Sequence, residues 1–411
     1  MRPLDGVRVL DLSRILAGPW ASQTLADFGA EVIKVERPGA GDDTRGWGPP
    51  WLRDRAGEAT GESAYYLCAN RGKRSLALDF TTPEGQRLVR ELAARSDVLL
   101  ENYKVGGLAR YGLDYPSLRQ INPKLVYCSI TGFGQTGPYA PRAGYDAAIQ
   151  AMGGLMSLTG EPDRPPQKVG VAVVDLMTAM YAVSGILAAL RHAERSGEGQ
   201  HLDLALLDVQ VAFLANQASN HLIGGEVPER LGSAHPNIVP YQPMPAADGH
   251  FMLAVGNDAQ FARLCEVIGQ PALARDPDYA SNAARVANRA ALLPQLEAAL
   301  RQQPRAYWLE RLEAVAVPAA PVNRIDEVFA DPQVQARGAR VSLPHPRHGE
   351  VPGVANPLRF SATPVRYGAA APELGEHSAQ VLSEVLGLGA QDIAALAAAG
   401  VVQLGESAPG A

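Results

Sequence analysis

The chain has 411 residues, of which 46% are hydrophobic and 19% charged, with 41 Gly and 32 Pro. This length exceeds what one hydrophobic core of ordinary size fills, so we expect two domains in a globular enzyme with many turns. The formal net charge of -6 excludes an overall positive field for nucleic acid or an anionic membrane, and an anionic ligand must meet a local cationic pocket.

The cysteines and the N-terminus indicate a cytoplasmic protein. Cys68, Cys128 and Cys265 are far apart and lack the short spacing of a zinc site or a redox pair, so we interpret them as reduced thiols. The first residues lack the apolar core of a signal peptide. We identify no run of the roughly 20 apolar residues that crosses a bilayer, and we expect neither a membrane nor a nucleic acid among the partners.

The first third of the chain alternates strand and helix patterns. Two helices are predicted, one from Pro19 to Gly29 and one over 83–96, where apolar residues share a face. Short β-branched runs predict strands at 7–13, 31–36, 75–80, 98–103 and 125–130. Strands separated by helices imply a buried parallel sheet, so the fold class is α/β.

The rest of the chain predicts a second domain and a returning segment. A long apolar helix runs from Asp175 to a turn near 197, and helices at 258–268, 284–302 and 305–314 accompany strands at 250–255 and 317–323. The predicted organisation is a large domain over 1–204, a linker helix over 205–228, a smaller α+β domain over 229–330, and a linker and C-terminal segment over 331–411 that returns to the large domain.

Several familiar motifs are missing. The turn after the first strand, SRILAGPW, lacks the three-glycine spacing of a dinucleotide site, although Glu36 ends the second strand as such a site requires. There is no phosphate-binding loop for ATP, no GxSxG elbow of a serine hydrolase and no HExxH pair for a metal. His235 lies in an unusual turn, for which we favour a loop role. We therefore predict no metal and no permanently bound cofactor.

Two charged turns follow or precede predicted strands. ERPGAGDDTR contains Glu36, Arg37, Asp42, Asp43 and Arg45, and NRGKR contains Arg71, Lys73 and Arg74. Loops at the carboxyl ends of parallel strands bind ligands, and Arg and Lys suit phosphate oxygens. The alternative is a set of solvated charged turns, and the pattern alone leaves both open.

Two further features could serve a reaction. Gly132, Gly134 and Gly137 follow a strand and would let backbone N–H groups approach an acyl or phosphate oxygen, or they only shape a turn. Asp175 stands alone at the start of the long apolar helix. It could cap that helix, or the helix N-terminus could keep its carboxylate ionised and available for attack.

Taken together, these blocks resemble the class III CoA-transferases, the superfamily of formyl-CoA transferase and carnitine CoA-transferase. The matching blocks are LDGVRVLDLSRILAGPW, GAEVIKVERPGAGDDTR, NRGKRSLALD, ENYKVGGLARYGLDY, NPKLVYCSITGFGQTGP, GYDAAIQAMGGLMSLTGEPDRPP, VGVAVVDLMTAMYA and LGEH. Within the family the sequence is similar to the succinyl-CoA:glutarate subgroup, with which it shares VERPGAGDDTR, WGPP, RAGYDA and IVPYQ.

The resemblance assigns roles to residues. It implies that Asp175 is the catalytic nucleophile rather than a cap, and that Tyr145 and Asp146 line the reaction site. It implies CoA contacts at Ile15, Arg37, Leu78, Asn102, Tyr103, Arg110 and Tyr111. Aromatic rings and a guanidinium suit an adenine and its phosphates. It also implies a Rossmann-like large domain, a smaller domain and an interlocked homodimer.

Two departures limit the substrate. Leu16 occupies the place of a glutamine in oxalate-specific members, so oxalate is disfavoured. A family lysine aligns with Ala143, and neighbouring Arg142 is our candidate for the same CoA contact. For a dicarboxylate, Arg14 or Arg45 could meet the distal carboxylate.

The expected reaction is covalent CoA transfer from an acyl-CoA, in first place succinyl-CoA, to a dicarboxylic acid such as glutarate. Asp175 would form an acyl anhydride and then an aspartyl-CoA thioester, with Gly132 and Gly134 near the oxyanion. Malate, itaconate, citramalate or an aromatic acid remain alternative acceptors. An α-methylacyl-CoA racemase is the closest rival, but Tyr145 stands where its histidine base would be and is a poor base at neutral pH. A non-catalytic CoA-binding protein is the third possibility.

Overall fold

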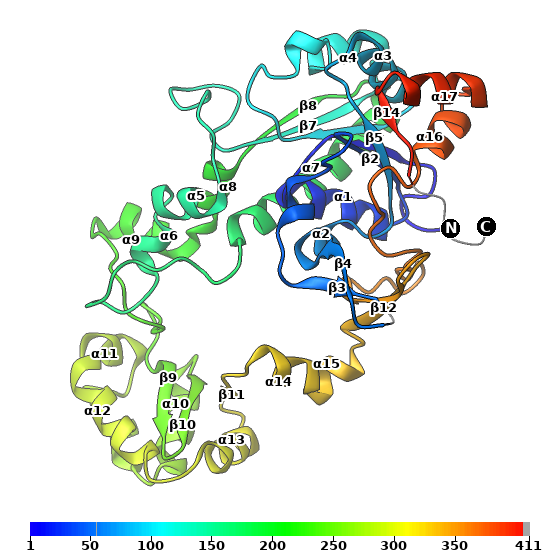
Figure 1. Ribbon diagram of the computed structural model, residues 1–411. Helices are drawn as coiled ribbons and strands as arrows, with labels where there is room; N and C mark the ends of the chain where they lie inside the picture. Colours follow the sequence, from blue (N-terminus) through cyan, green and yellow to red (C-terminus); the bar gives the residue numbers. More distant parts are fainter. Residues whose placement is uncertain (55, 406–411) are drawn as a thin grey trace. The chain divides into compact units, whose positions relative to one another are not determined.

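The computed structural model describes residues 1–54 and 56–405 (Figure 1). The chain divides into two compact units. Unit 1 comprises Met1–Gly154, Gly170–Ala215 and Gln335–Ala411, and unit 2 comprises Leu155–Val169 and Asn216–Val334.

A seven-stranded sheet forms the centre of unit 1, in the order β14-β5-β2-β1-β6-β7-β8. The strands are β1 (Arg8–Asp11), β2 (Glu31–Glu36), β5 (Lys73–Leu78), β6 (Val98–Glu101), β7 (Val126–Thr131), β8 (His201–Ala205) and β14 (Val402–Gln403). All neighbours are parallel except β14, which pairs antiparallel with β5. The predicted α/β class with a parallel sheet is confirmed.

Helices cover both faces of this sheet, because successive strand residues point to opposite sides. On one face Val9, Val98 and Val126 pack against α1 (Ala17–Asp27) and α7 (Val173–Ser196). On the other face Leu10, Leu99 and their neighbours pack against α3 (Pro83–Ala93), α4 (Tyr115–Ile121), α16 (Ser378–Glu384) and α17 (Ala390–Ala398). In Figure 1 the last two helices lie beside β14.

The longest helix, α7, corrects one sequence expectation. By length and hydropathy it could cross a membrane, since its 24 residues include an 18-residue window of mean hydropathy 1.8. Its small residues Ala179 and Ala182 and its Ile186 are buried in the core that α7 shares with α1 and the sheet. The buried part of α7 thus belongs to the core of unit 1.

The remaining elements of unit 1 are short. They are α2 (Ala64–Ala69), α5 (Asp146–Met152), α8 (Leu206–Phe213), the hairpins β3 (Trp51–Arg53)–β4 (Ala59–Ser63) and β12 (Arg340–His345)–β13 (Gly349–Val354), and 3-10 turns at Asp43–Gly46 and Ala109–Tyr111. The predicted linker helix is two helices, α8 and α9 (Ala215–Gly224), since the chain breaks at Ala215, whose φ is +45°.

Unit 2 has its own core around a three-stranded sheet, β11-β10-β9. Its elements are α6 (Leu155–Leu158), α9 from residue 216 onward, β9 (Tyr241–Ala246), β10 (Gly249–Ala254), α10 (Asp258–Val267), a 3-10 turn (Pro271–Arg275), α11 (Asn282–Ala287), α12 (Arg289–Leu300), α13 (Arg305–Ala314), β11 (Ala319–Pro321), α14 (Ile325–Ala330) and α15 (Pro332–Ala336), the last of which continues into the sequence of unit 1.

Unit 2 includes residues 155–169, which the sequence prediction placed in the large domain. The reason is local pairing. Gly160 forms a β-bridge with Gly232, and the guanidinium of Arg230 donates to the carbonyl oxygens of Glu161 and Arg164 at 3.2 Å each.

Candidate active site

A cavity of about 760 Å³ opens in unit 1 at the carboxyl ends of the parallel strands. Its wall comes from the loops after β1, β2, β5, β6 and β7 and from the first turn of α7. β1 lies at the centre of the sheet, between β2 and β6. The chain adds strands on one side of β1 through β2 and β5, and then on the other side through β6, β7 and β8, so the strand order reverses at β1. Open α/β sheets bind ligands at such a reversal, so the fold marks this cavity as a ligand site.

Most residues singled out from the sequence lie in this wall. They are Arg14, Ile15, Leu16, Arg37, Leu78, Asn102, Tyr103, Arg110, Tyr111, Gly132, Arg142, Tyr145 and Asp175. Arg45, Gly134, Gly137 and Asp146 are not part of it, and neither are Arg71, Lys73 and Arg74 of the second charged turn. Residues up to 192 positions apart in sequence, Arg14 and Leu206, contribute to one site.

Asp175 lies in the first turn of α7 but does not cap it. The N-cap position is Ala172, which provides no side-chain hydrogen bond. The carboxylate of Asp146, from the first turn of α5, accepts the N–H groups of Val174 at 2.8 Å and Asp175 at 3.3 Å. Because another residue caps the helix, the Asp175 carboxylate is available to face the cavity.

The electrostatics of Asp175 differ from the sequence expectation. Burial, and next the negative charge of Asp146, raise the pKa of Asp175 to about 7. Stabilisation of the Asp175 anion by the N-terminus of α7, one of the two roles left open by the sequence, does not lower the pKa of this carboxyl in the structure. The helix N–H groups that would stabilise Asp175 are bonded to Asp146, which is itself held by Gln150 at 2.6 Å.

Exposed cations surround the mouth of the cavity. Arg37, Lys104, Arg110 and Arg142 are all exposed wall residues. The guanidinium carbon of Arg110 lies 4.5 Å from the ring centroid of Tyr111. Exposed guanidinium and ammonium groups can bind phosphate oxygens at little desolvation cost, so the mouth fits a phosphorylated ligand.

An aromatic cluster stands beside these cations. Phe80 packs edge-on against Tyr103 and Tyr111, with ring centroids 5.7 and 5.6 Å apart. All three rings line the cavity. A flat base could stack against them while the nearby cations hold its phosphates.

Comparisons with known proteins agree with this geometry. The model of CoA-transferase family III matches residues 4–378. The succinate–glutarate CoA-transferase of Agrobacterium fabrum is 58% identical over 93% of this chain and 96% of its own. The succinyl-CoA:glutarate CoA-transferase of Mus musculus is 44% identical over 99% of this chain and 92% of its own. The crystal structure of a CAIB/BAIF family protein from Brucella suis has a TM-score of 0.82 at 53% identity, covering 93% of this chain and 99% of that one.

The chain belongs to CoA-transferase family III. The resemblance seen in the sequence is thereby confirmed, and the chain is an enzyme of the CoA-transferase class. The dinucleotide site, already disfavoured by the missing glycines, gains no support from the family model, which matches residues 4–378. CoA thioesters are the substrates of this class, so the cations and aromatic rings of the cavity have a fitting ligand.

Arg45 lies away from the cavity wall, unlike neighbouring Arg37. Its guanidinium binds both carboxylate oxygens of Glu36, at 2.9 and 3.0 Å, and donates to Tyr66 at 2.6 Å. The guanidinium carbon also stacks 3.7 Å from the Tyr66 ring centroid. The donors of Arg45 are thus bonded to Glu36 and Tyr66 inside the protein, where they fix the loop after β2. We therefore do not assign Arg45 to substrate binding.

Of the two glycines after β7 proposed for the oxyanion, Gly132 lines the cavity and Gly134 does not. Gly132 lines the cavity, and a Cβ there would lie 2.6 Å from the Cα of Gly144, so two backbone segments touch at this point. Gly134, with φ of +85°, donates its N–H to the Thr131 hydroxyl at 2.9 Å. That N–H is already bonded, so we also withdraw Gly134 as an oxyanion donor.

Sequence reasoning missed three residues of this region. Lys104 and Phe80 line the cavity, and each follows a strand end, which was the available signal. Tyr65 on α2 lies close enough to Asp175 for its charge to act on the Tyr65 hydroxyl. Burial raises the pKa of Tyr65 to about 12, and the charges of Asp175 and Asp146 contribute. Nothing in the sequence around Tyr65 indicates this proximity.

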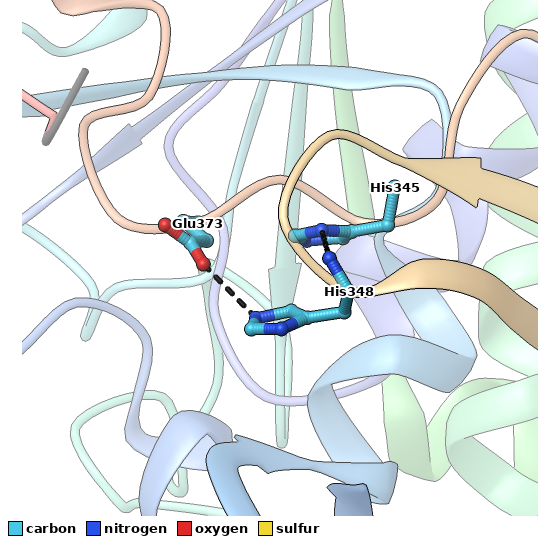
Figure 2. A group of neighbouring side chains, drawn as sticks. All are labelled: His345, His348 and Glu373. Atoms are coloured by element: carbon cyan, nitrogen blue, oxygen red, sulfur yellow. Dashed lines mark hydrogen bonds and ion pairs between the residues drawn. The ribbon is translucent and has the colours of Figure 1, made fainter. Parts of the chain in front are cut away.

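Among the described residues, one group of side chains has the composition of a metal site. His345, His348 and Glu373 have ligand atoms within 4.8 Å of one another, outside the cavity (Figure 2). Nδ1 of His345 accepts the backbone N–H groups of Arg347 and His348 at 3.2 Å each. The ring proton must therefore be on Nε2, where a metal would need a lone pair.

The other members of this group are engaged with each other. Figure 2 marks the contact between the His348 ring and Glu373. Nε2 of His348 lies 3.1 Å from one carboxylate oxygen, and Arg347 pairs with the second oxygen at 2.8 Å. A guanidinium on the carboxylate also repels a cation. We therefore interpret the group as an ion-paired cluster that fastens the β12–β13 turn, and we assign it no metal.

Proposed function

We propose that this enzyme moves CoA from succinyl-CoA to glutarate, with the Asp175 carboxylate as nucleophile. The observation that carries the proposal is the position of Asp175, whose partly buried carboxylate lies at the cavity wall. Asp146, not Asp175, accepts the free N–H groups at the start of α7. The named activities of the Agrobacterium and mouse relatives support the choice of donor and acceptor.

The chemistry proceeds in four displacements that balance without an external proton or oxidant. The ionised Asp175 attacks the thioester carbonyl of succinyl-CoA, the C–S bond breaks, and CoA leaves as a thiolate from the resulting anhydride. The thiolate attacks the Asp175 carbonyl, which releases succinate and leaves an aspartyl-CoA thioester. Glutarate attacks that thioester and expels the thiolate, which then attacks the glutaryl carbonyl. Glutaryl-CoA forms and the Asp175 carboxylate is restored.

The wall residues supply binding and exclusion of water. Arg37, Lys104 and Arg110 would hold the CoA phosphates, and Tyr103 with Tyr111 the adenine. Ile15, Leu78, Asn102 and Arg142 complete the proposed CoA contacts. Tyr145 and the Gly132 backbone lie on the same wall as Asp175 and would border the acyl group. Burial around Asp175 protects both intermediates from hydrolysis.

Arg14 is the candidate for the distal carboxylate of the acid. It is exposed at the cavity wall, pairs with Asp43 at 2.9 Å, and its guanidinium carbon lies 5.4 Å from the Tyr103 ring centroid. An exposed ion pair contributes little stability, so exchanging Asp43 for a substrate carboxylate costs little. Leu16, beside it, would contact the methylene chain.

We further propose that the enzyme is an interlocked homodimer in the cytoplasm. Apolar side chains that a separate chain would leave in water support a partner surface. They are Met180 and Tyr181 on α7, Val211 and Phe213 on α8, and Leu222 and Ile223 on α9. Cys68, Cys128 and Cys265 are free thiols, which suits a reducing compartment. Sedimentation equilibrium of the whole chain tests the dimer.

The test of the catalytic proposal is trapping of the intermediate. Wild-type enzyme is mixed with succinyl-CoA, treated with hydroxylamine or borohydride, and mapped by peptide mass spectrometry, while a panel of acids is assayed as acceptors. We expect modification at Asp175 and formation of glutaryl-CoA, and neither with Asp175→Asn.

A matched control is Asp208→Asn. Asp208 is exposed and occupies the same third position of its own helix, α8, outside the cavity. That variant should retain trapping and transfer. An unmodified Asp175 in an enzyme that still transfers CoA would refute the nucleophile, and exchange of the α hydrogen of an acyl-CoA with deuterium from solvent would instead indicate a racemase.

A further inference from the structure

The turn after β1 has a backbone conformation that its residue disfavours. Ile15 has φ of +74°, in the left-handed region that suits glycine and strains a β-branched side chain. Such strain persists only where the surroundings over-determine the conformation. Ile15 lines the cavity beside Arg14 and Leu16, so the strained residue belongs to the ligand site.

Side chains, rather than other backbone groups, hold this turn. Asn102 binds both sides of Arg14, accepting its N–H at 2.9 Å and donating to its carbonyl oxygen at 2.7 Å. The Asp42 carboxylate accepts the N–H of Ile15, with both oxygens 3.2 Å away. The two peptide groups that precede the Cα of Ile15 are thus fixed, one by Asn102 just after β6 and the other by Asn102 together with Asp42 from the loop after β2.

Asp42 is itself rigidly placed and ionised. It is 1% exposed and forms an ion pair at 2.9 Å with Lys34, whose side chain is completely buried and also donates to the Ser13 carbonyl at 2.8 Å. The Asp42 carboxylate also accepts the backbone N–H of Thr44 at 3.0 Å and its hydroxyl at 2.8 Å. Burial alone would raise the pKa of Asp42, but Lys34 and these donors outweigh it and hold the pKa at about 2.

The same residue connects two loops of the cavity wall. The backbone N–H of Asp42 donates to Glu36 at 3.1 Å, and Glu36 holds Arg45. The loop that carries Arg37 is therefore closed on itself and joined to the turn that carries Ile15. Both loops are thus held by contacts within unit 1.

We propose that Asp42 is a positioning residue for acyl-CoA, which acts by holding Ile15 in its left-handed conformation. A site that is already shaped does not lose binding energy to ordering its own loops when the ligand enters. The inference rests on the proposed function only in taking CoA as the ligand. It assigns Asp42 no role in bond making or breaking.

The first test is Asp42→Asn, read by calorimetric titration with CoA and by steady-state kinetics with succinyl-CoA and glutarate. Without the charged acceptor we expect Ile15 to relax, so that the Kd for CoA and the KM for succinyl-CoA rise about tenfold or more. The kcat should change less than about threefold, because Asp175 belongs to α7 and not to this turn.

A second arm asks whether Asp42 acts through Ile15. Glycine populates positive and negative φ about equally, so in an Ile15→Gly background the Asp42→Asn change should weaken CoA binding only about twofold. The two substitutions should therefore couple strongly in a double-mutant cycle. Equal losses in both backgrounds would overturn the proposal.

Two variants separate positioning from folding. Asp27→Asn removes one partner of another buried ion pair of unit 1, Arg71–Asp27 at 2.7 Å, outside the cavity, and should lower the Tm without changing the Kd for CoA. If Asp42→Asn does not fold, Lys34→Met with Asp42→Leu leaves no unpaired buried charge, and its Kd should still rise about tenfold. An unchanged Kd in a folded variant would overturn the positioning role, whereas a wild-type enzyme that binds no CoA would overturn the proposed function instead.

Discussion

Because burial and the charge of Asp146 raise the pKa of Asp175 to about 7, the attack on the thioester should depend on pH across the neutral range. Only the ionised carboxylate is a nucleophile. With a pKa near 7, about nine tenths of the free enzyme is ionised at pH 8 and about one tenth at pH 6. The rate of Asp175 acylation should therefore fall nearly tenfold between these values, whereas a carboxyl at its ordinary value of 3.8 would give a flat profile.

The assay measures that step alone. Enzyme is mixed with limiting succinyl-CoA without acceptor, quenched, and the Asp175 adduct is quantified by mass spectrometry from pH 5.5 to 8.5, so that titration of glutarate does not intrude. A rate that is constant over this range would refute the reasoning, since neither the burial nor the neighbouring charge would then govern the nucleophile.

Asp146→Asn isolates the part due to the neighbouring charge. The amide oxygen can still accept the N–H groups of Val174 and Asp175, so the helix start is kept while the negative charge is removed. The inflection should move to lower pH but stay above 3.8, because burial remains. A profile that does not move would leave burial as the sole cause.

Three further predictions concern binding and stability. Lys104→Ala should raise the Kd for CoA about tenfold and weaken its salt dependence while kcat stays within about twofold, because one exposed phosphate ligand is lost; unchanged calorimetric binding would contradict it. Burial raises the pKa of Glu101 to about 7, above the ordinary 4.5, so the folded state is favoured below about pH 4.5 and loses stability as the pH rises through 7. Glu101→Gln should therefore raise the Tm at pH 8 but hardly at pH 4.5, by up to roughly 3 kcal/mol in unfolding free energy. Ala182→Leu should destabilise by about 1–3 kcal/mol in urea unfolding, because the buried Ala182 faces the tight α1–α7 core.

The strands of the large sheet were predictable because their sequences carry the signal themselves. A run such as EVIKVE concentrates three β-branched apolar residues in six positions, which predicts β2 without any knowledge of its partners. Residues 155–169 carry no such period. Their place in unit 2 depends on Gly232 and Arg230, about 70 positions later, and a local pattern cannot contain that pairing.

The site shows the same limit in its charges. Arg37 and Arg45 lie in one loop of the sequence, yet Arg37 is exposed in the cavity wall and Arg45 is paired with Glu36. Composition could identify the loop but not which cation meets the ligand. Likewise, the sequence of α7 alone predicts Asp175 as its cap. Only the fold shows that Asp146, 29 residues before Asp175, accepts the N–H groups of Val174 and Asp175.

The placement of charge in the cavity also explains how one site can bind a polyanion and keep a carboxylate reactive. The cations Arg37, Lys104 and Arg110 are exposed at the mouth, where they attract phosphates, and among the described residues none pairs with Asp175. A cation beside the nucleophile would lower its pKa and also its reactivity toward a carbonyl carbon. Burial does the reverse, since it raises the pKa and leaves the anion poorly solvated. Under the proposed function, binding of CoA at the mouth brings the thioester to a carboxylate that no cation of the described residues pairs with.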